Sequence, residues 1–277
     1  MSYIFLYARG YKVLYRKIKT LIMKYQYEKS KRNKGRFCKE LKIFDINKCN
    51  TSKKDIYLYF HKYFWNKCPE EIRNHREYFR RNNRGFGEDA FHAMWYLLFK
   101  EFSPKYVLEI GIYRGQTLSL FSLLSEKFNL NSEIHGISPF NSTGDNVTKY
   151  IDALDYYQDV LLNYDHFGLA LPVFHKGLSI TNSMIKIINS KKWDLIYIDG
   201  NHDYEVAKQD FDVYLKNLNK NGLIILDDAS LYTDYIPPSF STAGHPGPSK
   251  IAEEIDTNIF EEILAVGHNR VFQQIKK

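Results

Sequence analysis

Two pairs of polar residues directly follow apolar runs and could together bind a metal ion or move a proton. Asp199 and His202 follow the run LIYI, and Asp227 and Asp228 follow the run LIIL. Carboxylates that converge repel one another unless a cation lies between them, and oxygen ligands favour Mg, Ca or Mn over zinc. An imidazole beside such a cation can accept a proton near neutral pH. The pattern therefore indicates a divalent-metal site with His202 as a candidate base.

Each of these residues also has a simpler interpretation. Asp199 could cap the helix that follows it, and His202 could be a polar residue of the first helical turn. Asp227 and Asp228 could be a loop pair that accepts hydrogen bonds from nearby backbone amides. The expected convergence of all four residues favours chemistry over these interpretations.

A second motif, E-x-G-x-x-x-G, contains Glu109, Gly111 and Gly115 and lies where a strand turns into a helix. Gly111 would let the backbone approach a ligand closely, and Gly115 would open a helix whose free N–H groups face that ligand. An acid at the strand end can bind a ribose hydroxyl or an amino group. The alternative is an ordinary glycine turn between a strand and a helix.

A long segment rich in Pro and Gly, residues 230–250, follows the acid pair and could be a lid or a substrate loop. His245 lies in it and could contact substrate, although a plain surface histidine is the simpler expectation. The stretch 236–240 loosely resembles the Asp/Asn-Pro-Pro-aromatic motif of amino-methylating enzymes. It follows the fifth strand instead of ending the fourth, so we do not assign that motif.

The elements that must position these residues alternate between strand and helix. Parallel strands buried on both faces fit this alternation, and the carboxyl ends of neighbouring strands, about 4.8 Å apart, bring side chains together. A three-residue connection near the end of the chain predicts an antiparallel hairpin. We expect an α/β fold with a Rossmann-like, doubly wound, mostly parallel sheet that ends in this hairpin. The expected strands are 106–110, 134–138, 173–176, 195–198, 223–226, 262–266 and 270–275, and the expected helices are 89–102, 115–128, 148–163, 180–190 and 204–218.

Charge divides the chain into two parts. Residues 1–87 hold 23 Lys and Arg against 7 Asp and Glu, whereas residues 88–277 hold 16 against 25. This asymmetry predicts a basic, mainly helical N-terminal extension, 1–87, followed by the α/β domain, 88–277.

Residues 1–36 carry 11 basic residues and one acid, with apolar residues at helical spacing. The expected basic amphipathic helix could dock on an anionic membrane surface or an acidic partner, or it could pack on its own domain or on a second subunit of a homo-oligomer. Binding to nucleic acid is a weaker expectation. The apolar residues are Tyr11, Leu14, Tyr15, Ile18, Leu21, Ile22 and Tyr25, flanked by Lys12, Arg16, Lys17, Lys19 and Lys24.

Composition narrows the class of protein. The 277 residues are 44% hydrophobic, enough for an ordinary core, and no apolar run approaches the roughly 20 residues of a membrane span. The cysteines Cys38, Cys49 and Cys68 form no C-x-x-C pair, which argues against a disulfide framework or a structural zinc site. We therefore expect a cytoplasmic protein, peripheral at the inner face of a membrane if the basic helix docks there.

The motifs VLEIGIYRGQTL, WDLIYIDGNHDYEVAKQDF and NGLIILDD occur in this order. With them, residues 104–277 resemble the class I S-adenosylmethionine-dependent methyltransferases, and more narrowly the metal-dependent sugar O-methyltransferases related to macrocin O-methyltransferase. The resemblance implies methylation of a sugar hydroxyl in a nucleotide-linked or lipid-linked glycan precursor.

The resemblance also implies roles for individual residues. Asp199, Asp227 and Asp228 would hold Mg²⁺ or Mn²⁺, with Asp199 and His202 as catalytic residues and His202 as the base. Two positions depart from the family pattern: Ser138 stands where an acid usually binds the ribose, and Leu178 cannot hydrogen-bond the adenine through its side chain. S-adenosyl-L-methionine would be bound by Glu109, Gly111, Tyr113, Gly115, Ser138 and Ser179.

Three other functions remain open. An iron-dependent hydroxylase of the cephalosporin-hydroxylase type would need two histidines and one carboxylate, and the sequence indicates only His202 for that role. A non-catalytic binding protein could keep the fold without the cofactor, which Ser138 and Leu178 would suit. A nucleic-acid methyltransferase would use the basic extension.

Overall fold

The structure, a computed structural model, describes residues 2–32, 40–49, 52–143, 147 and 150–275. One sheet of seven strands has the order β3-β2-β1-β4-β5-β7-β6, in which β1 to β5 pair in parallel and β7 pairs antiparallel with both β5 and β6. The predicted fold class is confirmed. The strands are β1 Tyr106–Ile110, β2 Glu133–Ser138, β3 Val173–Lys176, β4 Trp193–Ile198, β5 Leu218–Leu226, β6 Phe260–Val266 and β7 Asn269–Gln274.

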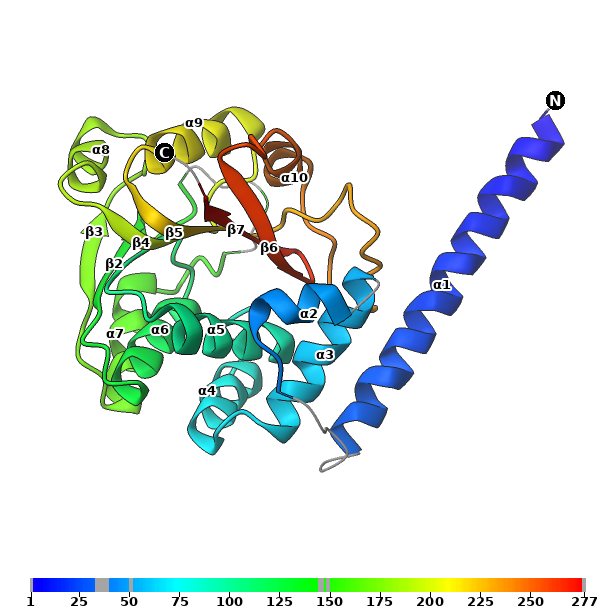
Figure 1. The fold of residues 1–277 in the computed structure, drawn as a ribbon, viewed down its shortest axis with the longest axis horizontal. Coiled ribbons are helices and arrows are strands. Elements are labelled where there is room, and N and C mark those ends of the chain that lie inside the picture. Colours follow the sequence, from blue (N-terminus) through cyan, green and yellow to red (C-terminus); the bar gives the residue numbers. More distant parts are fainter. Residues whose placement is uncertain (1, 33–39, 50–51, 144–146, 148–149, 276–277) are drawn as a thin grey trace.

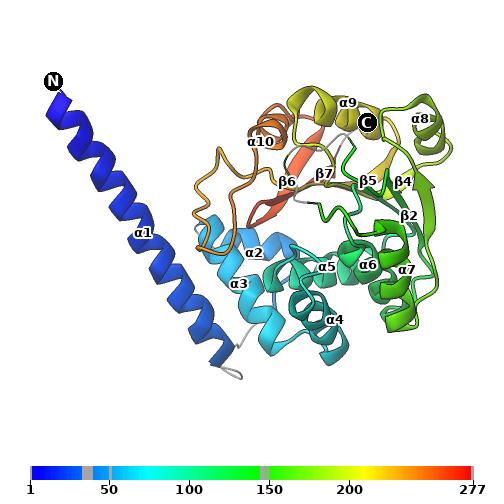
Figure 2. The ribbon, with the colours of Figure 1, turned by 180° about the vertical axis from the view of Figure 1, so that it is seen from behind.

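Helices cover both faces of the sheet (Figures 1 and 2). α5, α6 and α7 lie on one face with α2, α3 and α4 beside them, and α8, α9 and α10 lie on the other. The helices are α1 Ser2–Arg32, α2 Ile43–Cys49, α3 Lys53–Asn66, α4 Glu70–Arg81, α5 Asp89–Phe102, α6 Gln116–Lys127, α7 Tyr156–Phe167, α8 Asn182–Ile188, α9 Tyr204–Leu215 and α10 Pro246–Glu253.

Alternating side chains of the central strands enter two separate hydrophobic cores. In β1, Val107 packs on the α5 and α6 side, whereas Leu108 and Ile110 pack on the α8 to α10 side, and all three are buried. Burial on both faces explains why the parallel strands are nearly continuous apolar runs. The functional residues must therefore lie at the strand ends, where the side chains can leave the core.

Several predicted boundaries are wrong. The helix expected at 148–163 begins only at Tyr156, because the Asp155 side chain accepts a hydrogen bond from the backbone N–H of Gln158 and caps it there (3.0 Å); residues 148 and 149 lie outside the described residues. The hairpin connection has two residues, since Val266 pairs directly with Asn269. α10, which begins inside the segment expected to be a loop, was not predicted.

The basic extension packs onto the α/β domain through a buried carboxylate. Asp89, 4% exposed at the start of α5, accepts hydrogen bonds from Tyr27 Oη and Trp65 Nε1, each at 3.0 Å, and pairs with Arg76 Nε at 3.3 Å. Apolar residues of α2 and α3 also enter the same core as α5. The helices before residue 88 therefore share a core with the α/β domain, and the predicted division at residue 87 stays a prediction.

Buried histidines join α4 to α5 and α6. His75 Nδ1 lies 3.2 Å from His92 Nε2, and His75 Nε2 lies 3.0 Å from Ser119 Oγ. Burial lowers the pKa of His75 to about 3 and that of His61, on α3, to about 4. Both imidazoles are thus neutral in the folded protein.

We predict that acidification destabilises the fold through these histidines. Their folded-state pKa values lie below the unfolded value, so the unfolded chain binds more protons and stability is lost as the pH falls below about 6.5. At about pH 5 the free energy of unfolding should have fallen by about 2 kcal/mol for each histidine, measured by urea unfolding. His75→Gln should reduce stability near pH 7 but show a smaller fall on acidification, and an unchanged fall would contradict the assignment.

Candidate functional site

The three carboxylates of the predicted metal site meet at the carboxyl ends of β4 and β5. Ile198 and Leu226 are register partners, so Asp199 and Asp227 leave the two strands side by side. The backbone N–H of Asp199 donates to Ile110 O at 2.8 Å, and that of Asp227 donates to Ile198 O at 3.0 Å. The convergence is therefore imposed by the sheet register.

Electrostatics at this edge reflect crowded negative charge. Burial, then the neighbouring Asp227 and Asp228 carboxylates, raise the pKa of Asp199 well above its ordinary value. Burial also raises the pKa of Asp227. For Asp228, burial acts in the same direction, but the hydrogen bond from His202 and the charge of His268 lower its pKa overall. His202, beside Asp228, and His268, beside Asp227, face this negative charge.

Asp199 does not cap α9. The N-cap of that helix is Asp203, so the simpler interpretation of Asp199 is wrong. Its Oδ2 instead accepts a hydrogen bond from Tyr197 Oη at 3.2 Å. His202 is likewise outside the helix, and its Nε2 lies 3.0 Å from Asp228 Oδ2. Both residues lie in the predicted site.

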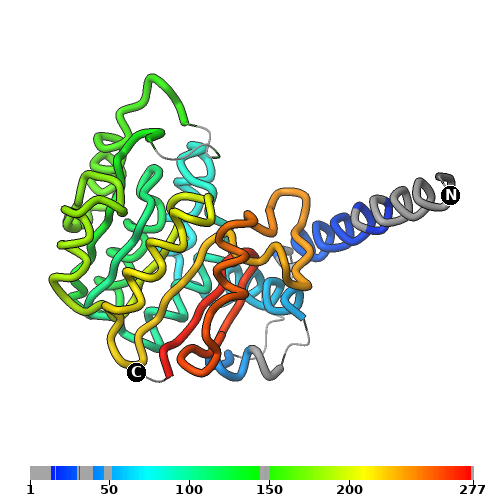
Figure 3. The backbone as a smooth tube through the Cα atoms, turned by 90° about the horizontal axis from the view of Figure 1, so that it is seen from above, coloured from blue at the N-terminus to red at the C-terminus, as the bar shows by residue number. Residues whose placement is uncertain are grey.

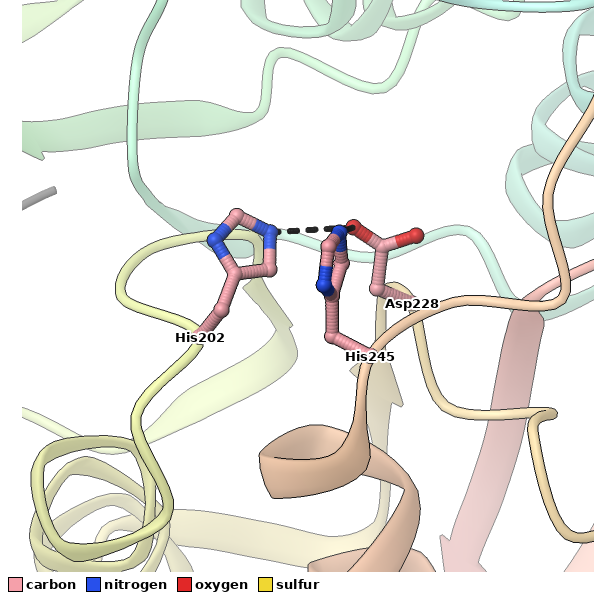
Figure 4. A group of neighbouring side chains, drawn as sticks. All are labelled: His202, Asp228 and His245. Carbon is pink, nitrogen blue, oxygen red and sulfur yellow. Dashed lines mark hydrogen bonds and ion pairs between the residues drawn. The ribbon is translucent and has the colours of Figure 1, made fainter. Parts of the chain in front are cut away.

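His245 was expected to be a plain surface histidine, and the structure contradicts this. Its side chain is 33% exposed, its Nε2 lies 3.8 Å from Asp228 Oδ2, and its ring lies beside that of His202, with ring centroids 4.3 Å apart (Figure 4). The backbone fixes this position because His245 N donates to Asp228 O at 2.8 Å. Asp228 itself adopts a left-handed φ of 51°, which Asp tolerates better than most non-glycine residues. Two histidines and a carboxylate therefore converge here.

His268 is a site residue that the sequence reasoning missed. It lies in the β6–β7 turn, with Nε2 3.3 Å from Asp227 Oδ1 and Nδ1 3.2 Å from Thr242 O. Burial alone would lower its pKa, but the Asp227 and Asp228 carboxylates raise it. The predicted hairpin could have located this residue: β7 runs antiparallel to β5, so the turn before β7 must lie at the carboxyl end of β5.

Two cavities open beside the carboxylates. One is lined by Glu109 and Gly115 together with Asp227 and His268, and the other by Ser138 and its neighbours together with His202. The predicted cofactor residues are thus divided between two adjoining spaces, with the acid cluster beside both. The lining residues that the two cavities share are Phe86, Gly111, Tyr113 and Asp199.

The last residues of the extension, the loop 84–87, also line the first cavity. Gly87 N donates to Gln116 Oε1 at 3.1 Å, and Arg84 Nη1 pairs with Asp159 Oδ1 at 2.6 Å. Asp159 also binds Arg114 through two hydrogen bonds, of 2.6 and 3.0 Å. This loop is therefore tied to the glycine motif, a contribution that the sequence reasoning did not predict.

The predicted serine contacts are already used within the protein. Ser138 Oγ donates to Ile112 O at 3.0 Å and accepts from Phe140 N at 3.1 Å. Ser179 Oγ donates to Asp210 Oδ2 at 3.0 Å. Both residues line the second cavity, but each hydroxyl proton is committed to a protein acceptor.

Sequence comparison identifies the domain. Residues 108–229, from β1 to the end of β5, match the family model described as a methyltransferase domain. An uncharacterized protein of Acanthamoeba polyphaga mimivirus is 27% identical over 174 residues, which cover 60% of this chain and 70% of that protein. Over these residues the predicted resemblance to methyltransferases is confirmed, and the narrower resemblance to the metal-dependent sugar O-methyltransferases stays a prediction.

Solved structures share the fold. The Podospora anserina methyltransferase PaMTH1, solved with S-adenosylhomocysteine, is 16% identical, with 76% of this chain and 89% of that one covered and a TM-score of 0.54. TomG, an O-methyltransferase of Streptomyces achromogenes solved with S-adenosylmethionine, is 14% identical, with 76% of this chain and 92% of that one covered and a TM-score of 0.52. An O-methyltransferase of Bacillus cereus solved with S-adenosylhomocysteine is 13% identical, with 76% of this chain and 92% of that one covered and a TM-score of 0.51. These likenesses show the fold.

Gly111 is required by a close backbone approach, and we predict a large cost for Gly111→Ala. A Cβ there would lie 1.8 Å from Asp199 O, at a φ of 93°. Gly168, which ends α7 at a φ of 63° with nothing near its Cβ position, is a matched control. Gly168→Ala should cost about 1 kcal/mol of stability and Gly111→Ala at least about 3 kcal/mol, measured by chemical unfolding. Equal costs would show that the contact with Asp199 is unimportant.

Proposed function

We propose that this protein, whose residues 108–229 match a methyltransferase domain, is an S-adenosylmethionine-dependent O-methyltransferase assisted by a divalent metal ion. The acceptor would be a sugar hydroxyl in a nucleotide-linked or lipid-linked glycan precursor. The observation that carries the proposal is the cluster of Asp199, Asp227 and Asp228 beside two adjoining cavities.

The cofactor would occupy the space around the glycine motif. Glu109, Gly111, Tyr113 and Gly115 line the first cavity, and the loop 84–87 covers it from the extension. Bound S-adenosylmethionine would supply a sulfonium methyl group for in-line displacement. Among solved structures of this fold, TomG binds S-adenosylmethionine and PaMTH1 binds S-adenosylhomocysteine, which supports the choice of cofactor.

The acid cluster suits a divalent cation. Glu109 Oε2 is buried without a hydrogen-bond partner among the described residues, and the buried Asp227 Oδ1 faces His268 Nε2 at 3.3 Å. Burial and the neighbouring carboxylates raise the pKa of Asp199, and burial raises that of Asp227, as expected for acids crowded at one edge of the sheet. A bound Mg²⁺ or Mn²⁺ would orient the acceptor hydroxyl and lower its pKa.

His202 would remove the acceptor proton. Its Nε2 hydrogen bond with Asp228 stabilises the protonated imidazole and holds the ring at the edge of the second cavity. The loop 84–87 would limit the access of water to the first cavity. These residues act by positioning and proton transfer, and no covalent enzyme intermediate is needed.

Sequence motifs and two aromatic side chains support a sugar as the acceptor. This acceptor is supported by the resemblance of the segments around Asp199 and Asp227 to the metal-dependent sugar O-methyltransferases. The aromatic rings of Phe86 and Tyr113, with centroids 5.0 Å apart, border both cavities and offer apolar faces to a sugar ring.

Calorimetric titration of S-adenosylhomocysteine into metal-free and Mg²⁺-loaded protein tests whether the protein binds this cofactor product. A methyl-transfer assay with nucleotide-linked sugars as acceptors tests the reaction.

We predict that Asp228→Asn binds S-adenosylhomocysteine normally but loses methyl transfer by at least about a hundredfold, because metal binding and the hydrogen bond to His202 are both impaired. Asp234→Asn, at an exposed carboxylate of the following loop, is the matched control and should be unchanged. No binding of S-adenosylhomocysteine would instead indicate a non-catalytic binding protein.

One observation favours a second candidate, the iron-dependent hydroxylase. Contrary to the sequence expectation, His202, Asp228 and His245 together form a cluster of two histidines and one carboxylate. If methyl transfer is the function, we predict that His245→Gln keeps its Mg²⁺ affinity within about threefold, since oxygen ligands hold this ion. Iron copurifying at one ion per chain and lost in His245→Gln would support the hydroxylase, and metal analysis of both proteins decides between the two.

A further inference from the structure

One face of α1 attaches this helix to the rest of the molecule. Met23 is 1% exposed, and Thr20 Oγ1 lies 3.5 Å from Pro237 O. Tyr27 bonds Asp89, and its ring lies 3.8 Å from His61 and 4.7 Å from Phe240, measured between ring centroids. Since 3.6 residues make a turn, residues 20, 23 and 27 lie on one side of the helix.

The opposite side of α1 carries an apolar stripe that the domain leaves exposed. Positions 14, 18, 21 and 25 follow the helical repeat and lie nearly opposite the attached side. Figure 3 shows α1 leading away from the α/β body. The side chains of Tyr11, Lys12 and Arg16, also expected on this helix, lie outside the described residues. The stripe consists of Leu14 (57% exposed), Ile18 (47%), Leu21 (66%), Ile22 (46%) and Tyr25 (67%).

Cationic side chains border the stripe. Lys17 and Lys24 lie on one side of it and Lys19 on the other, and Lys17 and Lys24 are exposed. The sequence of α1 contains nine Lys and Arg but a single acid, Glu28. A second copy of this helix on the stripe would bring two strongly positive surfaces together. An anionic lipid surface complements both the apolar stripe and its charged borders.

We propose that α1 binds the surface of anionic membranes, with the apolar stripe inserted at the boundary between headgroups and acyl chains. None of the helices that the structure describes is long and apolar enough to cross a membrane. This docking is independent of the reaction that the site catalyses.

The attachment of α1 connects the membrane surface to the loop that reaches the site. Pro237 and Phe240, which contact α1, belong to the segment between Asp228 and His245. Ser230 N donates to Ala243 O at 3.1 Å, so this segment closes on itself beside the carboxylates. Docking through the stripe therefore holds the site beside the bilayer, where a lipid-linked precursor would be presented.

The test is cosedimentation of the full chain with vesicles of phosphatidylcholine alone and of phosphatidylcholine with phosphatidylglycerol. Leu21→Ser with Tyr25→Ser should weaken binding to the anionic vesicles about tenfold or more. Leu162→Ser with Leu171→Ser removes two leucines that are each 59% exposed, and should bind normally. Removal of exposed side chains leaves the core intact, so both proteins should fold.

The double variant Lys17→Glu with Lys24→Glu tests the role of charge, and it should weaken binding to the anionic vesicles by at least about tenfold. The matched control is Lys216→Glu with Lys220→Glu, which should bind normally. Equal binding by the stripe variant and its leucine control would overturn the proposal, as would equal binding to both kinds of vesicle. A molar mass by light scattering that is double in the wild type and single in the stripe variant would also overturn it, because the stripe would then bind a second copy.

Discussion

The mutual repulsion of Asp199, Asp227 and Asp228 is the constraint on which this end of the molecule depends. Two like charges about 4 Å apart cost about 4 kcal/mol at an effective dielectric constant near 20, which is a large part of the stability of a typical domain. This repulsion contributes to the raised pKa values of Asp199 and Asp227, and His202 and His268 offset part of the negative charge. A cluster of this kind suits the divalent cation proposed above.

The backbone maintains the cluster against this repulsion. Gly111 allows the ends of β1 and β4 to approach so closely that no side chain fits between them. Asp228 is held in a left-handed conformation, with its carbonyl accepting from His245 N and from Ser249 Oγ at 3.2 Å. Strain of this kind persists where surrounding contacts over-determine it. The register of β4 and β5 therefore sets the positions of Asp199 and Asp227, and the hydrogen bonds from His245 and Ser249 hold the backbone at Asp228.

The sequence predicts the carboxylates well and the histidines poorly, for a physical reason. Asp199, Asp227 and Asp228 follow strands whose order and direction the alternation of elements implies, so their convergence needs no knowledge of loops. His245 and His268 reach the same place through a loop closed by backbone hydrogen bonds and through the hairpin turn, which only the tertiary structure places. The sequence pattern sets no separate bounds for the helices between residues 37 and 87, and in the structure apolar residues of these helices share one core with α5.

The exposed stripe on α1 follows from the contacts that hold the opposite side of this helix against the rest of the molecule. The partners of α1 include polar groups, namely the buried Asp89 carboxylate, His61 and the Pro237 carbonyl, as well as the ring of Phe240. Loss of one hydrogen bond to a charged group costs about 1.5–3 kcal/mol, so the bond from Tyr27 to the buried Asp89 favours keeping this face inward. Rotating the helix to bury Leu21 would set an apolar side chain against those polar groups and leave Asp89 short of a donor. The orientation that satisfies Asp89 is therefore the one that leaves the apolar, cation-bordered side available to a surface outside the domain.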